Sequence, residues 1–143
     1  MSHTVLLVDD DDRVLNGLAR TLRGQPYQIY TAKSGEEAKW VLKSQMVDVV
    51  VTDEKMPGLS GTDLLAWVAG HRPEVVRMVL TGYATVDTAI RAINEGGVSH
   101  FFTKPCNEFE LSVVIHKALE QKDQLRREQE RSNRASDAAA PRA

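Results

Sequence analysis

Five side chains that can bind a metal ion or a phosphoryl group stand directly after short apolar runs of the sequence. Asp9 and Asp10 follow the first such run, and Asp53 follows the third. Thr81 and Lys104 follow the fourth and the fifth. Three carboxylates in one pocket repel one another, and Mg²⁺, which commonly binds through one or two carboxylates, waters and a phosphate, removes that repulsion. The set therefore predicts a magnesium site, provided that the fold brings the runs together.

The same side chains suit phosphoryl transfer. With Mg²⁺ bound, an aspartate can act as a nucleophile toward phosphorus, while Lys104 offers a cation and Thr81 a hydroxyl to the phosphoryl oxygens. Each residue alone has an ordinary structural explanation, because aspartates often cap helices, as we expect Asp11 and Asp12 to do. The combination of all five residues, each near the end of an apolar run, is what indicates phosphoryl chemistry.

These groups meet only if the apolar runs are strands of one sheet. The sequence alternates apolar runs with helical patterns, and the predicted strands are residues 4–8, 27–32, 47–52, 75–80 and 98–103. Five such units with right-handed crossovers predict an α/β fold, an open, doubly wound parallel sheet with helices on both faces. Ligands bind such sheets outside the carboxyl ends of the strands, where the strand order reverses. A flavodoxin-like order, 2-1-3-4-5, makes the first and third strands neighbours and gathers the aspartates in one pocket.

Capping residues predict where the intervening helices begin and end. Ser34, Ser60, Thr85 and Asn107 each stand at the start of a helical pattern, and the glycine pair 96–97 suits a left-handed helix end. The helical pattern of the last helix continues beyond the residues whose apolar side chains form one face. We therefore expect a domain over residues 1–121, and over residues 122–143 a helical extension followed by a disordered tail from about Ser132.

Composition narrows the class of protein. The chain has 143 residues, a formal charge of −2 and 42% hydrophobic residues, which is ordinary for one globular domain without general affinity for nucleic acid. Its longest apolar run, residues 64–69, is far shorter than the roughly 20 residues of a membrane span. The N-terminal apolar run lacks a basic stretch and meets four aspartates, unlike a signal peptide. A single cysteine, Cys106, excludes an internal disulfide. We expect a cytoplasmic protein.

Together the motifs resemble the receiver domain of bacterial two-component response regulators. They are Val-Asp9-Asp10, Asp53-Glu-Lys-Met-Pro-Gly, Thr81-Gly and Lys104-Pro. They occur in the family's order, and the similarity covers roughly residues 3 to 121. The resemblance implies that Asp53 accepts a phosphoryl group from a histidine kinase or phosphotransfer protein. It also implies that the chain is no turnover enzyme and catalyses only its own phosphorylation and dephosphorylation.

The resemblance also implies roles for further positions. Mg²⁺ would be held by Asp10 and Asp53, with help from Asp9 and the main-chain carbonyl of Lys55. Phe101 matches the family's switch aromatic, which acts with Thr81, and the bond between Lys104 and Pro105 would be cis. Phosphorylation would change the face formed by the fourth helix, fifth strand and fifth helix, through which the chain would form a homodimer or control an output domain or partner. The sequence leaves open whether the chain is a stand-alone regulator or part of a longer protein.

Two other functions remain open at this point. A phosphatase resembling the haloacid dehalogenase superfamily would use Asp9 and Asp11, but Arg13 stands where that family usually has Thr or Val, and Asp53 would be idle. A receiver-like interaction module that takes no phosphate would not require all five site residues.

Lys55 and Tyr83 flank the approach of water to the phosphoryl group in the resembled fold, so we also predict a long-lived phosphoryl group.

Overall fold

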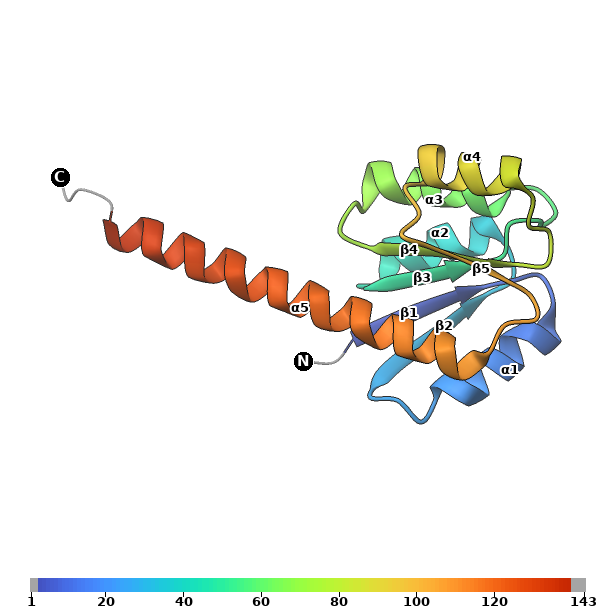
Figure 1. The fold of residues 1–143 in the computed structure, drawn as a ribbon, viewed down its shortest axis with the longest axis horizontal. Coiled ribbons are helices and arrows are strands. Elements are labelled where there is room, and N and C mark those ends of the chain that lie inside the picture. Colours follow the sequence, from blue (N-terminus) through green and yellow to red (C-terminus); the bar gives the residue numbers. More distant parts are fainter. Residues whose placement is uncertain (1–2, 140–143) are drawn as a thin grey trace.

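The computed structural model describes residues 3–139, which form a five-stranded sheet and five helices (Figure 1). The strands are β1 (His3–Val8), β2 (Tyr27–Ala32), β3 (Val49–Thr52), β4 (Val76–Thr81) and β5 (His100–Thr103). The helices are α1 (Asp12–Leu22), α2 (Gly35–Ser44), α3 (Gly61–His71), α4 (Val86–Gly96) and α5 (Glu108–Ala139). None of these helices is long and apolar enough to cross a membrane.

All neighbouring strands pair in parallel, in the order β2-β1-β3-β4-β5. This order confirms the predicted flavodoxin-like α/β fold. The central strands β1 and β3 are almost wholly apolar because helices cover both of their faces. Val8 pairs with Thr52 in the register of β1 and β3, so the next residues, Asp9 and Asp53, leave the sheet side by side.

Two hydrophobic cores lie on opposite faces of the sheet. Apolar residues of α1 and α5 pack on one face, and those of α2, α3 and α4 pack on the other. Figure 1 shows α3 and α4 on the opposite side of the sheet from α1. Side chains such as Leu22 and Leu64 are fully buried, and each stabilises the fold by about 1.5–3 kcal/mol relative to an exposed side chain. The two cores hold the carboxyl ends of the strands together at one edge.

The predicted helix starts are confirmed by their caps. The side chains of Asp11, Ser34, Ser60 and Thr85 accept hydrogen bonds from main-chain N–H groups of the first turns that follow them. Gly97 ends α4 with φ of 61°, in the left-handed region. β3 and β5 each begin two residues later than predicted, because Val47 and Val98 pack against the core without pairing in the sheet.

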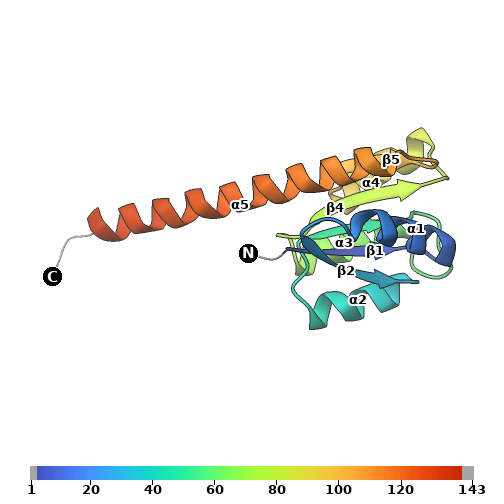
Figure 2. The same cartoon turned by 90° about the horizontal axis from the view of Figure 1, so that it is seen from below.

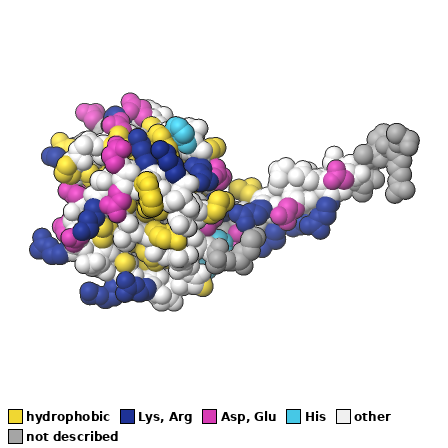
Figure 3. Space-filling model, turned by 180° about the vertical axis from the view of Figure 1, so that it is seen from behind, with side chains coloured by type: hydrophobic (Ala, Val, Ile, Leu, Met, Phe, Trp, Pro, Cys, Tyr) yellow, Lys and Arg dark blue, Asp and Glu magenta, His cyan; other side chains and the backbone are white. Residues whose placement is uncertain are grey.

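The last helix differs from the prediction. α5 continues to Ala139, past the predicted start of a disordered tail at about Ser132, while the final residues of that predicted tail, 140–143, lie outside the described residues. The reason is composition, since arginine, glutamate, glutamine and alanine have high helix propensity and no glycine or proline interrupts α5. Figures 1 and 2 show the helix projecting beyond the sheet, and Figure 3 shows charged side chains of both signs along it.

Two ion pairs fix the base of this projection. The Asp123 carboxylate lies 2.9 Å from the His3 ring nitrogen, and Lys122 Nζ lies 3.1 Å from the Asp48 carboxylate. All four side chains are mostly shielded from solvent. The extension predicted to start at residue 122 therefore begins with one turn that still contacts the sheet.

Candidate functional site

The five side chains singled out in the sequence all stand at the carboxyl edge of the sheet. Main-chain hydrogen bonds continue the strand pairing past the strand ends, with Asp53 N–H donating to Val8 O at 2.9 Å and Lys104 N–H donating to Thr81 O at 2.8 Å. Asp9 N–H donates to Ala32 O at 3.1 Å. The backbones of Asp9, Asp53 and Lys104 are thus each fixed by a neighbouring strand.

Lys104 links the two buried carboxylates. Its Nζ lies 2.7 Å from Asp9 Oδ2 and 3.4 Å from Asp53 Oδ2. Asp9 and Asp53 are 3% and 8% exposed, so water screens their charges weakly and a fixed cation interacts strongly with both. The peptide bond between Lys104 and Pro105 is cis, as the sequence resemblance implied.

The other oxygen of each buried carboxylate is also occupied. Asp9 Oδ1 accepts a hydrogen bond from Asp11 N–H at 2.9 Å, and Asp53 Oδ1 accepts one from Glu54 N–H at 2.8 Å. These contacts fix the plane of each carboxylate. Asp53 stands on the central strand of the three, between Asp9 after β1 and Thr81 at the end of β4.

The three aspartates are close enough to share one cation. Asp9, Asp10 and Asp53 each offer a carboxylate oxygen, and these oxygens lie within 4.8 Å of one another, the one such cluster in residues 3–139. The ligand oxygens of an octahedral Mg²⁺ with bonds of about 2.1 Å are at most about 4.2 Å apart. The oxygen-only donor set suits Mg²⁺, and the carboxylates would have to move together only slightly from their spacing of up to 4.8 Å to reach this limit. The Lys55 carbonyl stays a predicted ligand.

Burial has the largest effect on the pKa values of Asp9 and Lys104. Burial raises the pKa of Asp9 and the nearby Asp53 carboxylate raises it further, although the hydrogen bonds from Lys104 and Asp11 N–H lower it. Burial alone would lower the pKa of Lys104, but its contacts with Asp9 and Asp53 outweigh that effect and raise it. Lys104 therefore stays charged, yet one ammonium does not fully compensate two buried carboxylates.

Within residues 3–139, neither predicted switch residue is hydrogen-bonded to the site carboxylates. Thr81 is buried, and its Oγ1 accepts a hydrogen bond from Tyr83 N–H at 3.1 Å. Phe101 is partly buried and packs on the core shared with α2, α3 and α4, while Phe102 packs on the opposite core. Their switching roles stay predictions.

The segment between β3 and α3 contributes residues that sequence reasoning missed. A Cβ atom at Gly61 would lie 2.1 Å from Asp53 O, so only glycine allows α3 to begin this close to the site. The Glu54 carboxylate, 6% exposed, accepts hydrogen bonds from Thr62 N–H at 2.9 Å and Thr62 O–H at 2.6 Å. An acidic residue directly after Asp53 was the one available signal.

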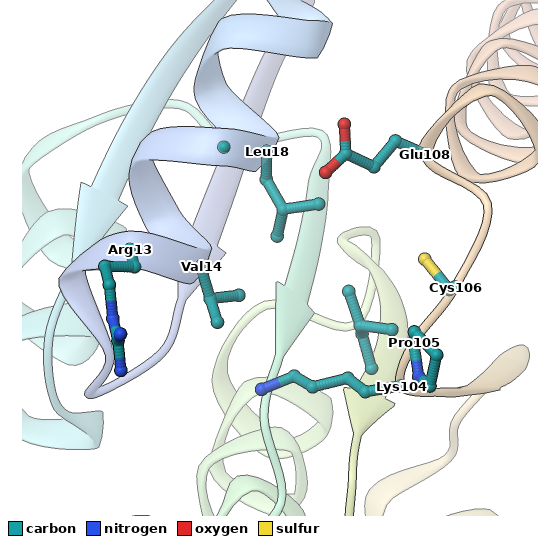
Figure 4. A pocket seen from close by; sticks show the side chains of 9 residues that line it. Arg13, Val14, Leu18, Lys104, Pro105, Cys106 and Glu108 are labelled. Carbon is teal, nitrogen blue, oxygen red and sulfur yellow. The ribbon is translucent and has the colours of Figure 1, made fainter.

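Two cavities flank the site. One of about 220 Å³ lies between α1 and the segment after β5, where Lys104 passes Val14 and Leu18 of α1 (Figure 4). Cys106 lines it, and burial raises the pKa of its thiol, which agrees with its interpretation as a small hydrophobe. The second cavity, also about 220 Å³, is lined by Lys55 and Tyr83 among others.

Comparison with known proteins places this geometry in a family. The chain matches the model of the response regulator receiver domain over residues 5–116. It is 37% identical over 117 residues to the hydrogenase transcriptional regulatory protein HoxA of Cupriavidus necator, covering 82% of this chain and 24% of that protein. It is 36% identical over 124 residues to the transcriptional regulatory protein GlrR of Escherichia coli, covering 85% and 28%. The chain thus spans about a quarter of the length of these curated relatives.

Solved structures agree. The signal receiver domain of an HD domain-containing protein from Pseudomonas fluorescens matches with a TM-score of 0.84 and 31% identity, over 87% of this chain and 99% of that one. A CheY-like receiver domain protein from Methanospirillum hungatei matches with a TM-score of 0.83 and 25% identity, over 87% and 98%. With a family model that covers most of its length, the chain belongs to the response regulator receiver domains of two-component systems.

Proposed function

We propose that the chain is a signalling switch that accepts a phosphoryl group on Asp53. The observation that carries this proposal is the position of the Lys104 ammonium, 2.7 Å from Asp9 and 3.4 Å from Asp53. The shorter contact and the Asp11 N–H engage both oxygens of Asp9. Asp53 Oδ2 is held more loosely and stands centrally on the sheet edge, so Asp53 is the better placed nucleophile.

The phosphoryl donor is a phosphohistidine of a histidine kinase or phosphotransfer protein. A bond forms between phosphorus and an Asp53 oxygen while the bond between phosphorus and the imidazole nitrogen breaks, and that nitrogen takes up a proton from solvent. Lys104 pairs with a phosphoryl oxygen and the Thr81 hydroxyl donates to another. Asp9, Asp10, Asp53 and the main-chain carbonyl of Lys55 would hold Mg²⁺, which would supply the positive charge that offsets repulsion among the carboxylates and phosphoryl oxygens.

A phosphatase centred on Asp9 is less well supported. Asp11, the second acidic residue such a site would use, instead accepts a hydrogen bond from Arg13 N–H at 2.9 Å as the cap of α1. That role engages a carboxylate oxygen of Asp11 in the helix cap. The chain thus catalyses only its own phosphorylation and dephosphorylation.

The output lies on the face formed by α4, β5 and α5. Val86, Ile90 and Ile93 of α4 are at least half exposed, and exposed apolar side chains on one helix suit a homodimer or an output partner. Phosphorylation draws Thr81 toward the phosphoryl group, and Phe101 follows. The matched relatives are longer transcriptional regulators, so an output domain for this chain is part of the proposal.

Phosphorylation of Asp53 is tested by intact mass. Incubation of the wild type with Mg²⁺ and phosphoramidate is expected to add one phosphoryl group, and removal of Mg²⁺ by a chelator is expected to suppress the reaction. Asp53→Asn, which lacks a nucleophilic carboxylate, is expected to gain nothing. Asp12→Asn is the matched control, because Asp12 is exposed and pairs only with Lys33. Equal phosphorylation of Asp53→Asn and wild type rules out Asp53 as the acceptor.

Mg²⁺ is also expected to stabilise the unphosphorylated protein. A ligand at ten times its Kd adds about 1.4 kcal/mol, which corresponds to roughly 4 °C in Tm for a domain of this size. The Asp10→Ala, Asp53→Ala double variant loses two of the three carboxylates, so its Tm is expected not to respond. Thermal unfolding over a Mg²⁺ titration measures both proteins, and the same rise in each contradicts the site.

A further inference from the structure

Glu54 is a buried carboxylate beside the phosphoacceptor, and one of its oxygens faces another helix. Its Oε2 accepts two hydrogen bonds from Thr62, at 2.9 and 2.6 Å. Its Oε1 lies 3.9 Å from Nη1 of Arg91 on α4. A buried carboxylate is costly without a nearby cation, and Arg91 supplies that cation from α4.

Arg91 connects α4 with two other parts of the chain. Its Nη2 lies 2.6 Å from Asp63 on α3, and its Nε lies 2.8 Å from Glu95 on α4 itself. One guanidinium thus contacts three carboxylates, of which Glu54 follows the phosphoacceptor, Asp63 lies on α3 and Glu95 lies within α4. The planar guanidinium can bind several carboxylates at once, which a lysine ammonium does less well.

The first half of α4 has no buried side chain. Only Ala92 and Gly96 of this helix are buried, and both lie in its second half. Val86 and Ile90 in the first half are 75% and 50% exposed. Elements with few buried apolar contacts open at low free-energy cost. The second half of α4 packs closely on α3, where a Cβ at Gly96 would lie 3.3 Å from Leu65 Cβ, so in the first half the Arg91 ion pairs add to a weaker attachment.

The same half of α4 is connected to Thr81. Thr81 Oγ1 accepts a hydrogen bond from Tyr83 N–H at 3.1 Å, and the Tyr83 carbonyl lies 3.5 Å from Thr88 Oγ1 in the first turn of α4. If Thr81 turns toward a phosphoryl group, the Tyr83 contact is lost, and the loop and first turn are free to move. The Arg91 pairs oppose such a movement.

We propose that Glu54 and Arg91 are positioning residues that hold α4 against α3 and thereby restrain the phosphorylation of Asp53. This proposal rests on the proposed phosphoacceptor function. The conformation in which Thr81 is released reacts faster, because its hydroxyl is then available to the phosphoryl oxygens. Loss of the pairs between α3 and α4 raises the population of that conformation, and the rate rises with the population.

The test compares variants that lose the ion pair between α4 and α3 with a variant that loses only the ion pair within α4. Arg91→Met and Asp63→Asn remove the connection to α3, while Glu95→Gln, the matched control, removes only the contact within α4. We expect phosphorylation by phosphoramidate with Mg²⁺ to be about threefold to fivefold faster in the first two variants. Amide hydrogen exchange over residues 86–91 of the unphosphorylated protein is expected to rise by a similar factor. Glu95→Gln is expected to stay within about twofold of wild type in both measurements.

Two further variants separate positioning from general destabilisation. Arg91→Lys keeps a charge that can pair with one carboxylate at a time, so its rate is expected to lie between those of wild type and Arg91→Met. Glu54→Gln keeps an acceptor for Thr62 but removes the charge facing Arg91, and is expected to react faster than wild type. If Arg91→Met and Asp63→Asn match Glu95→Gln in rate and exchange, the proposal is wrong. If wild type takes no phosphate, the proposed function fails, and exchange over residues 86–91 alone decides whether Arg91 restrains α4.

Discussion

Replacing Gly61 with alanine is expected to lower Tm by about 10 °C. The new Cβ atom would lie 2.1 Å from Asp53 O, 2.9 Å from Asp53 C and 2.9 Å from Glu54 Cα. All three are main-chain atoms, which cannot move aside by rotating a side chain. Overpacking of this kind costs about 3 kcal/mol or more, and each kcal/mol corresponds to about 3 °C in a domain of this size.

Gly70→Ala is the matched control for this prediction. Gly70 lies on the same helix, and a Cβ there would meet nothing within 4 Å. Alanine favours a helix over glycine by about 0.5–1 kcal/mol, so Gly70→Ala is expected to keep or slightly raise Tm. Thermal unfolding by circular dichroism without Mg²⁺ measures both variants. A Gly61→Ala protein as stable as the wild type contradicts the close approach of α3 to Asp53.

The sheet and its site were predictable because both follow from local patterns. Apolar runs alternate with capped helical patterns, and this order leaves few ways to arrange a parallel sheet. Once β1 and β3 are neighbours, the side chains after them must lie together. That is why the sequence alone predicted Asp9 and Asp53 at one edge of the sheet. It predicted Lys104 only as a cation for phosphoryl oxygens, and its ion pairs with both carboxylates emerged from the structure.

Contacts that depend on the path of the connecting loops, or that join residues far apart in the sequence, were not predictable. Gly61 follows Ser60 and looks in the sequence like an ordinary residue at a helix start. Glycine is required there because any Cβ atom would clash with the main chain of Asp53. Arg91 and Glu54 are far apart in the sequence, and no periodicity connects a charge on α4 with one after β3. The extent of α5 depended on composition, because helix propensity outweighed the serine, alanine and proline content that had suggested a disordered tail from about Ser132.

The phosphoryl group on Asp53 is expected to be lost about tenfold faster from the Lys55→Asn, Tyr83→Ala double variant. Hydrolysis requires a water in line with the breaking bond, on the side opposite the Asp53 oxygen. Lys55 Nζ lies 4.6 Å from the centroid of the Tyr83 ring, a cation–π contact. The two side chains therefore lie against each other rather than extending separately into solvent. A tenfold change in rate corresponds to about 1.4 kcal/mol of barrier.

Two single variants divide this effect between the ring and the charge. Tyr83→Phe keeps the ring and the cation–π contact, so its phosphoryl half-life is expected to match that of wild type. Lys55→Met keeps a stem of similar length without the charge, and any shortening of its half-life reports pairing of the ammonium with a phosphoryl oxygen. Intact mass after removal of the phosphodonor follows each decay. A double variant that loses its phosphoryl group no faster than wild type shows that water reaches the site by a path these side chains do not cover.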